Sequence, residues 1–132
     1  MTQGPKNRAD LIYPDLSYQI VGCSYNVFNE LGFGQKEVIY QRALEKELKR
    51  TGFAAEREKR FPINYKGDVV GSYMPDFIVE NKVVVELKVR PKIGYVHINQ
   101  VVQYLRATER KLAIIIYFTR DGVKYRRVVN IN

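Results

Sequence analysis

Outside the polar break at residues 80–82, three charged side chains interrupt an otherwise apolar stretch at residues 73–89. They are Asp76, Glu86 and Lys88, and a short polar break between two apolar runs predicts that they lie on a β-hairpin. Alternate side chains of a strand share a face, so Glu86 and Lys88 should point to the same side as Val84. Charges are costly to bury in an apolar strand, and their presence there indicates a functional site.

The register of this hairpin decides whether the two acids meet. If Val79 pairs with Val83 across a three-residue loop, Asp76 falls directly opposite Glu86, whereas a slip of one residue separates them. Two adjacent carboxylates repel each other unless a cation lies between them. Hard oxygen ligands of this kind suit Mg²⁺ or Mn²⁺. Lys88 would face the same pocket, where it could orient a water molecule or stabilise an anionic transition state.

Length and charge restrict the class of protein. The 132 residues fit a single domain, and we expect residues 1–10 to be flexible. A net charge of +8 and a pI near 9.6 favour a polyanionic partner, nucleic acid before membrane. For charge alone, a surface that only keeps the protein dissolved is an equally good explanation. The single cysteine, Cys23, excludes an intrachain disulfide and a Cys-rich zinc site.

The distribution of apolar residues indicates where in the cell the protein is expected. Hydrophobic residues make up 45% of the chain, which is enough for a globular core. No apolar run approaches the ~18 residues that a membrane helix needs, and the first ten residues lack the apolar core of a signal peptide. We therefore expect a cytoplasmic protein with no membrane partner.

Hydrophobic periodicity and turn signals predict eight elements in the order helix, helix, three strands, helix, two strands. The helices are expected from Asp15 or Ser17 to Leu31, from about Gln35 to Arg50 and from about Tyr95 to Ala107, and the strands at 55–65, 69–79, 82–89, 111–118 and 123–131. Pro75 should interrupt the second strand because it has no N–H to donate. A helical crossover joins the third and fourth strands and favours their parallel pairing. The expected fold is α/β, with a mixed central sheet flanked by helices.

The second and third helices place further polar residues beside the core. Glu37 begins an apolar stripe of the second helix, although a first-turn glutamate is also favoured by the helix dipole alone. Gln100 and Tyr104 lie four residues apart on the third helix, where they could orient a water or a phosphate oxygen. The alternative is a boundary tyrosine that packs its ring and hydrates its hydroxyl. His97 is the sole histidine, and because a lone histidine more often caps or packs than binds a metal, its role stays open.

These residues resemble the motifs of a known family. Pro75-Asp76, nine residues, and then Glu86-Leu87-Lys88 resembles the signature of the PD-(D/E)XK nuclease superfamily. Gly34-x-x-Glu37-x-x-Tyr40 resembles the motif of the GxxExxY family, a branch of that superfamily, and Gln100-x-x-x-Tyr104 is similar to a motif of related exonuclease-type members. The resemblance covers roughly residues 28–128, and Met74-Pro75 before Asp76 is a departure that leaves the acid intact.

The resemblance implies a restriction-endonuclease-like core that hydrolyses phosphodiester bonds with a divalent metal ion. Asp76, Glu86 and the Leu87 carbonyl would bind Mg²⁺ or Mn²⁺. Glu37 would add a ligand directly or through water, or help to hold a second ion. Lys88 would orient or activate the attacking water. Gln100 and Tyr104 would support the site.

Other functions remain open from the sequence. The chain could be a non-catalytic nucleic-acid-binding or assembly module with the same fold, or an interaction protein that dimerises through strand 113–116, although that strand is expected to be central and buried. Basic residues at 57–60, 90–92 and 124–127 could follow a phosphate backbone. DNA is the expected substrate, with RNA, endo- or exonuclease action and a homodimer left undecided.

Overall fold

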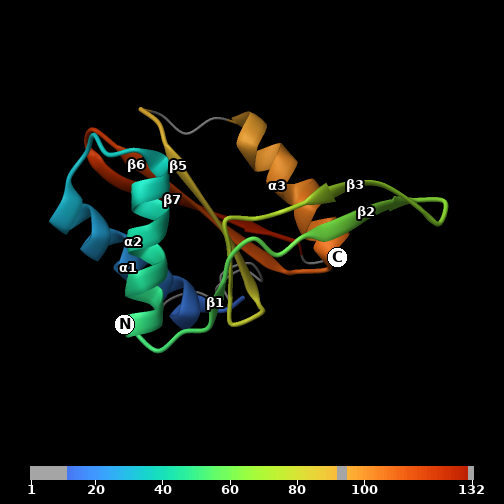
Figure 1. Cartoon of the computed structure of the whole chain (residues 1–132), viewed down its shortest axis with the longest axis horizontal. Coiled ribbons are helices and arrows are strands. Elements are labelled where there is room, and N and C mark those ends of the chain that lie inside the picture. Colours follow the sequence, from blue (N-terminus) through green and yellow to red (C-terminus); the bar gives the residue numbers. More distant parts are fainter. Residues whose placement is uncertain (1–11, 92–94, 131–132) are drawn as a thin grey trace, which may run out of the picture.

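The computed structural model of the chain describes residues 12–91 and 95–130, apart from the side chains of residues 95–97. A five-stranded sheet forms its centre, with helices on both faces (Figure 1). The elements are α1 (Pro14–Leu31), α2 (Glu37–Arg50), β1 (Ala55–Glu56), β2 (Phe61–Tyr65), β3 (Asp68–Tyr73), β4 (Phe77–Val79), β5 (Val83–Val89), α3 (Tyr95–Thr108), β6 (Leu112–Thr119) and β7 (Gly122–Val129).

The sheet has the order β1-β4-β5-β6-β7, with β5 and β6 parallel and the other neighbours antiparallel. The crossover through α3 thus produces the predicted parallel pair, and the predicted mixed α/β fold is confirmed. Every residue of β6 is buried, as a strand with neighbours on both edges and helices on both faces should be. The β6 backbone therefore offers no free edge through which two chains could pair.

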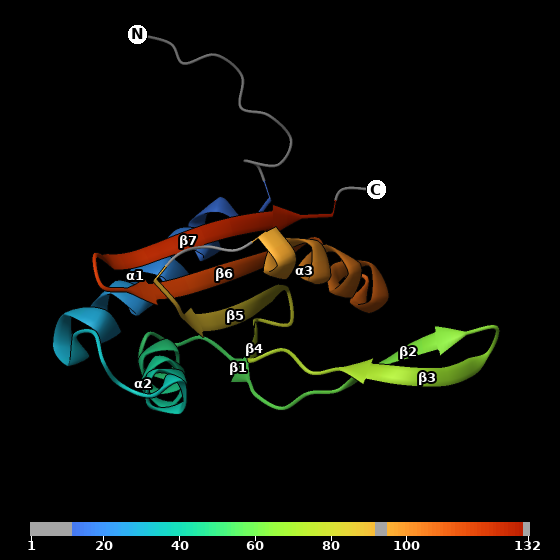
Figure 2. The same cartoon turned by 90° about the horizontal axis from the view of Figure 1, so that it is seen from above.

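Helices α1 and α2 cover one face of the sheet and α3 covers the other (Figure 2). The predicted apolar stripe of α2 is confirmed, because Tyr40, Leu44 and Leu48 are fully buried against β5 and β6 residues of that face. On the opposite face, Val101 and Leu105 of α3 pack on Val84 and Ile115. The alternation along β5 sends Val84, Glu86 and Lys88 toward the α3 side.

Two expected long strands are each divided. Strand 55–65 becomes β1 and β2, separated near Glu58, whose φ of 61° lies outside the extended range. Strand 69–79 becomes β3 and β4, separated at Pro75, where the interruption was predicted. The strands β2 and β3 then pair only with each other, as a two-stranded sheet with a bulge between Ile63 and Asn64.

No helix within residues 12–91 and 95–130 is long and apolar enough to cross a membrane. Cys23 is buried, as expected for a small core residue. The expected flexibility of residues 1–10 and the predicted end of the last strand at Ile131 fall outside the described residues.

The central position of β6 predicts a large cost for truncating its side chains. Ile114 is fully buried between the two helical layers, and we expect Ile114→Ala to lower the free energy of unfolding by about 2–5 kcal/mol in urea denaturation. Val69→Ala is the control, because Val69 is 66% exposed and its truncation should change stability by only about 0.5 kcal/mol. Equal effects of the two substitutions would contradict the buried position of β6.

Candidate active site

The hairpin of β4 and β5 brings the two central acids together. Its register is Val79 with Val83, Ile78 with Val84 and Phe77 with Val85, so that the next position sets Asp76 against Glu86, as predicted. The Asp76 carboxylate also reaches the β5 backbone, because the amide of Leu87 donates a hydrogen bond of 2.8 Å to its Oδ2.

A pocket of about 290 Å³ opens at this point, between β5, α3 and the end of β3. Asp76, Glu86 and Lys88 contribute its charged lining, and Gln100 and Tyr104 line it from α3. The Gln100 side chain donates a hydrogen bond of 2.7 Å to the Tyr104 hydroxyl, so the two predicted polar residues of α3 hold each other. Five of the six residues expected in one site therefore share a single pocket.

Tyr73 also belongs to the site and was missed in the sequence. Its hydroxyl donates a hydrogen bond to Glu86, and its ring stacks on Tyr104 with centroids 3.6 Å apart and an interplanar angle of 11°. Tyr73 thereby connects β3, the acid on β5 and the helix α3. Pro75 breaks the strand between Tyr73 and Asp76, so no periodicity relates the two, and only a tyrosine near the charged stretch could have been noticed.

Burial and mutual repulsion make both carboxylates easy to protonate. Desolvation, reinforced by the negative charge of Asp76, raises the pKa of Glu86 from its ordinary 4.5 to about 8. Burial also raises the pKa of Asp76, although the Leu87 amide and Lys88 oppose this increase. The pKa of the Tyr73 hydroxyl is raised as well, by burial and then by the nearby Glu86, so Tyr73 stays a hydrogen-bond donor.

Glu37 approaches the same region from the opposite face of the sheet. Its Oε1 accepts a hydrogen bond of 3.2 Å from the backbone amide of Val89, at the end of β5. Its negative charge contributes to the raised pKa of Asp76, but Glu37 does not line the pocket. Tyr40, one turn further along α2, fixes the loop before the helix, because its hydroxyl bonds the Gly32 carbonyl and the Gln35 amide.

The donor set fits a divalent cation held mainly by solvent. Among the described residues, no group of three or more His, Cys, Asp and Glu side chains is arranged to hold a metal ion. The two convergent carboxylates nevertheless match Mg²⁺, which is commonly bound through one or two carboxylates and keeps several waters. Burial is the main cause of the raised pKa of Glu86 and the charge of Asp76 is the second, and a cation between the two carboxylates would offset this second contribution.

Several of the expected phosphate-binding residues have partners within the chain. Arg57 contacts Gln41, Glu45 and the ring of Phe77, and Arg127 donates a hydrogen bond to the Ile12 carbonyl. Lys124 and Arg126 are exposed on β7. Lys92 and the His97 side chain lie outside the described residues.

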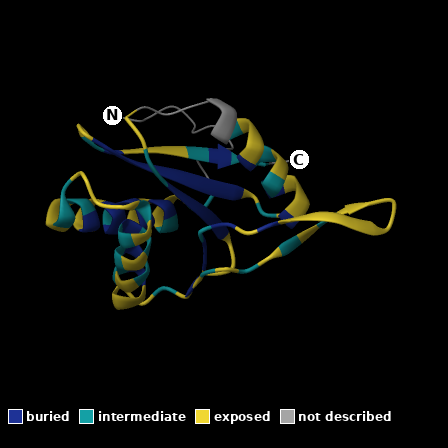
Figure 3. Ribbon diagram, turned by 45° about the horizontal axis from the view of Figure 1, so that its top comes forward, coloured by how far each residue is buried: buried dark blue, intermediate teal, exposed yellow. Residues whose placement is uncertain are grey.

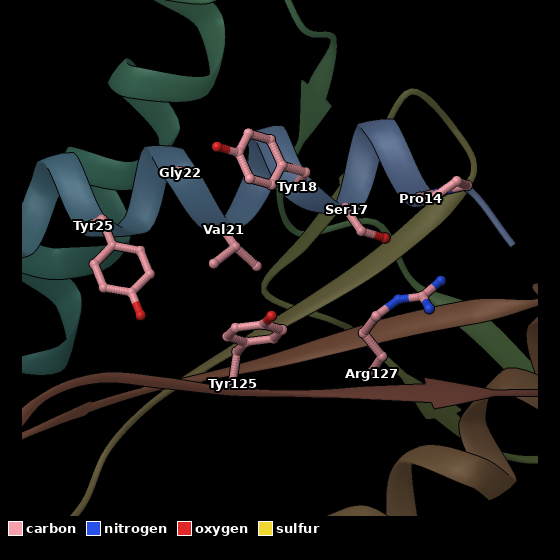
Figure 4. Close-up of a pocket in the computed structure, with 8 residues that line it drawn as sticks. All are labelled: Pro14, Ser17, Tyr18, Val21, Gly22, Tyr25, Tyr125 and Arg127. Carbon is pink, nitrogen blue, oxygen red and sulfur yellow. The ribbon is translucent and has the colours of Figure 1, made fainter. Parts of the chain in front are cut away.

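A second and larger groove, of about 440 Å³, lies on the other face of the sheet between α1 and β7. Figure 4 shows tyrosines from both elements, Tyr18 and Tyr25 of α1 and Tyr125 of β7, at its walls. Arg127 is its charged residue, and no carboxylate is among the described residues that line it. This groove therefore lacks carboxylate donors for a cation, and the convergent acids Asp76 and Glu86 lie in the smaller pocket.

Comparisons with known proteins agree with this geometry. The sequence profile of the PD-(D/E)XK nuclease superfamily matches residues 14–128. The solved structure titled "Crystal structure of SSO0001" superposes with a TM-score of 0.58 at 22% identity, over 93% of this chain and 60% of that one, and shows the fold. An alkaline exonuclease (LHK-Exo) from Laribacter hongkongensis aligns over 93% of this chain and 75% of its own, at 11% identity and a TM-score of 0.43, too low to support an argument. No curated protein matches the sequence.

The raised pKa of Glu86 predicts that stability depends on pH when divalent cations are chelated. Between about pH 4.5 and pH 8 the folded protein keeps a proton on Glu86 that the unfolded chain has released. The free energy of unfolding should therefore fall as the pH rises through this window, by up to about 1.4 kcal/mol per pH unit. Urea denaturation in EDTA at several pH values measures this slope.

Glu86→Gln should flatten the slope, because the amide has no proton to lose, and a smaller slope from Asp76 should remain. Glu30→Gln, at an exposed position of α1, is the matched control and should leave the slope unchanged. An identical slope in wild type and Glu86→Gln would show that the acid is not buried in this way.

Proposed function

Because the chain belongs to the PD-(D/E)XK nuclease superfamily, we propose that it is a metal-dependent nuclease that hydrolyses phosphodiester bonds of nucleic acid, with DNA as the preferred substrate. The observation that carries the proposal is the pocket in which Asp76, Glu86 and Lys88 meet. Two acids and a lysine in one polar cavity can bind a cation and an anionic phosphate side by side.

Asp76, Glu86 and the backbone carbonyl of Leu87 are the proposed ligands of Mg²⁺ or Mn²⁺. When bound, such an ion supplies positive charge to the scissile phosphate and acidity to a coordinated water. Glu37 is the proposed outer partner: it lies outside the pocket and holds the end of β5 through the Val89 amide, so it would reach the ion through water. In this arrangement Glu37 positions the strand that carries Glu86.

Lys88 is the proposed group that acts on the attacking water. It lines the pocket two positions after Glu86 on the same face of β5, so its ammonium faces the space that a phosphate would enter. There it orients the water by hydrogen bonding and offsets the negative charge that accumulates on the phosphate oxygens. Gln100 and Tyr104 close the opposite wall of the pocket, where their polar groups can hold a water or a phosphate oxygen.

The alternative is a module that binds nucleic acid without cutting it. A buried glutamate beside an aspartate costs stability, and a module without catalysis gains nothing that would offset this cost. The two proposals differ in a direct measurement of cleavage, since both predict binding that weakens with salt.

Removal of the charge of Asp76 or of Lys88 should greatly reduce cleavage. With labelled single-stranded, duplex and branched DNA and with RNA, we expect wild type to cut at least one substrate with Mg²⁺ or Mn²⁺ and none with EDTA. Asp76→Asn and Lys88→Met should lower the rate by about 100-fold or more. Lys46→Met, at an exposed position of α2, is the matched control and should keep the wild-type rate.

Salt-dependent binding with no metal-dependent cleavage of any of these substrates would favour the binding module. Equal cleavage by wild type and Asp76→Asn would place the activity elsewhere.

Tyr73→Phe tests the hydrogen bond to Glu86. The hydroxyl favours the ionised carboxylate, so its loss should make Glu86 harder to deprotonate and weaken cation binding. We expect the metal concentration that gives half-maximal cleavage to rise about tenfold at pH 7, and to rise less at pH 9. Tyr125→Phe, on the other face of the sheet, is the control. A tenfold change that is the same at both pH values would mean that the tyrosine acts only by packing.

A further inference from the structure

The β2–β3 hairpin, residues 61–73, extends away from the body of the molecule (Figure 2). We call it the arm. Its base is fixed, because Phe61, Ile63 and Tyr73 pack against the α3 side of the core and the Arg110 guanidinium lies 5.6 Å from the Phe61 ring centroid. An isolated two-stranded hairpin is marginally stable in water, so these contacts at the base hold the arm in place.

The tip of the arm exposes large apolar side chains. Tyr65, Val69 and Val70 are 60%, 66% and 63% exposed, and Figure 3 shows the outer part of the arm exposed beside a buried central sheet. Single exposed apolar residues are ordinary on protein surfaces, but three at the end of a projecting hairpin form a contact surface that no other described part of the chain covers.

The position of the arm and the charge of the chain indicate the partner. Strand β3 runs from the tip directly into the pocket, where Ser72 and Tyr73 form part of the lining beside Asp76. A polymer that places a phosphate in the pocket can therefore continue along the arm. The arm itself carries Lys66 and Asp68, whose charges balance, while the basic residues Lys59 and Arg60 directly precede its base, in a chain whose net charge of +8 complements a polyanion.

We propose that the arm is a substrate-binding element whose tip contacts unpaired bases of a branched or partly single-stranded nucleic acid. This inference rests on the proposed nuclease function of the adjacent pocket. Apolar side chains gain little from phosphates but can stack on or insert between bases, which is easiest where the bases are already unpaired. Lys66 lies 5.3 Å from the ring centroid of Tyr65, so a phosphate contact and a stacking surface occur together at the tip.

The length of the arm fixes where this contact falls. The six residues of β3 span roughly 17 Å at about 3.4 Å per residue. Nucleotides of one strand are spaced about 3.4 Å along a duplex, so the tip reaches about five nucleotides from the phosphate in the pocket. The arm therefore selects substrates whose unpaired region lies about that far from the cleaved bond, on one side of it only.

The absence of tryptophan from the sequence permits a site-specific reporter. Tyr65→Trp places a single indole at the tip, and Tyr18→Trp places one at a similarly exposed position, 82% exposed, on the other face of the sheet. In EDTA, titration with a branched DNA should quench the fluorescence of Tyr65→Trp to saturation and leave that of Tyr18→Trp unchanged. Binding detected by anisotropy of labelled DNA, with no change at Tyr65→Trp, would overturn the proposal.

A variant with Tyr65→Ser, Val69→Ser and Val70→Ser measures the contribution of the tip. We expect its affinity for branched DNA to fall about tenfold or more, with affinity for a fully paired duplex and the melting temperature unchanged. Equal affinities of wild type and variant for branched DNA would refute the arm as a base contact. Concentration-dependent fluorescence change and dimer formation of Tyr65→Trp without DNA would identify a second copy of the chain as the partner and likewise refute it.

The binding measurements in EDTA and the cleavage test can fail separately. If the protein binds branched DNA through the tip but never cuts, the arm proposal holds and the nuclease proposal fails. If wild type and the triple variant cut branched and paired substrates with the same preference, the nuclease proposal holds and the arm proposal fails.

Discussion

The structure depends on the close approach of two carboxylates, Asp76 and Glu86, inside a mostly apolar fold. Burial disfavours each charge and their proximity disfavours both together, which is why the pKa of Glu86 rises to about 8. The neighbouring groups reduce this penalty without removing it: the Leu87 amide bonds Asp76, and the Tyr73 hydroxyl bonds Glu86. A divalent cation between the two carboxylates would offset the repulsion that remains, and the proposed metal site rests on this.

The rest of the fold holds this pair in register. A slip of one residue between β4 and β5 would turn Asp76 away from the face that carries Glu86 and Lys88, so the two acids would no longer meet. The parallel pairing with β6 fixes the position of β5 along the sheet. Helix α3 forms the wall of the pocket that carries Gln100 and Tyr104. The packing that stabilises the core therefore also positions the side chains that line the pocket.

Much of this arrangement could be predicted from the sequence, because it follows from short-range patterns. Two apolar runs separated by the three residues between Val79 and Val83 allowed the register that the structure has, and the helical crossover indicated the parallel pair. Tyr73 could not be predicted, since its place in the site depends on stacking against a helix thirty residues away in the chain. The position of Glu37 outside the pocket could not be predicted either. Helical periodicity shows that a residue faces the sheet, but not which part of a strand its side chain contacts. The arm was not predicted for a related reason. Strand propensity shows that β2 and β3 are strands, but not that they pair only with each other and not with the main sheet.

The central claim is that Asp76 and Glu86 jointly bind a divalent cation. The most direct test is anomalous diffraction from a crystal of the protein soaked in Mn²⁺. We expect a single strong peak between the two carboxylates and near the Leu87 carbonyl, which disappears in Asp76→Asn. A well-ordered pocket without a manganese peak at saturating Mn²⁺, or a peak that survives this substitution, would contradict it.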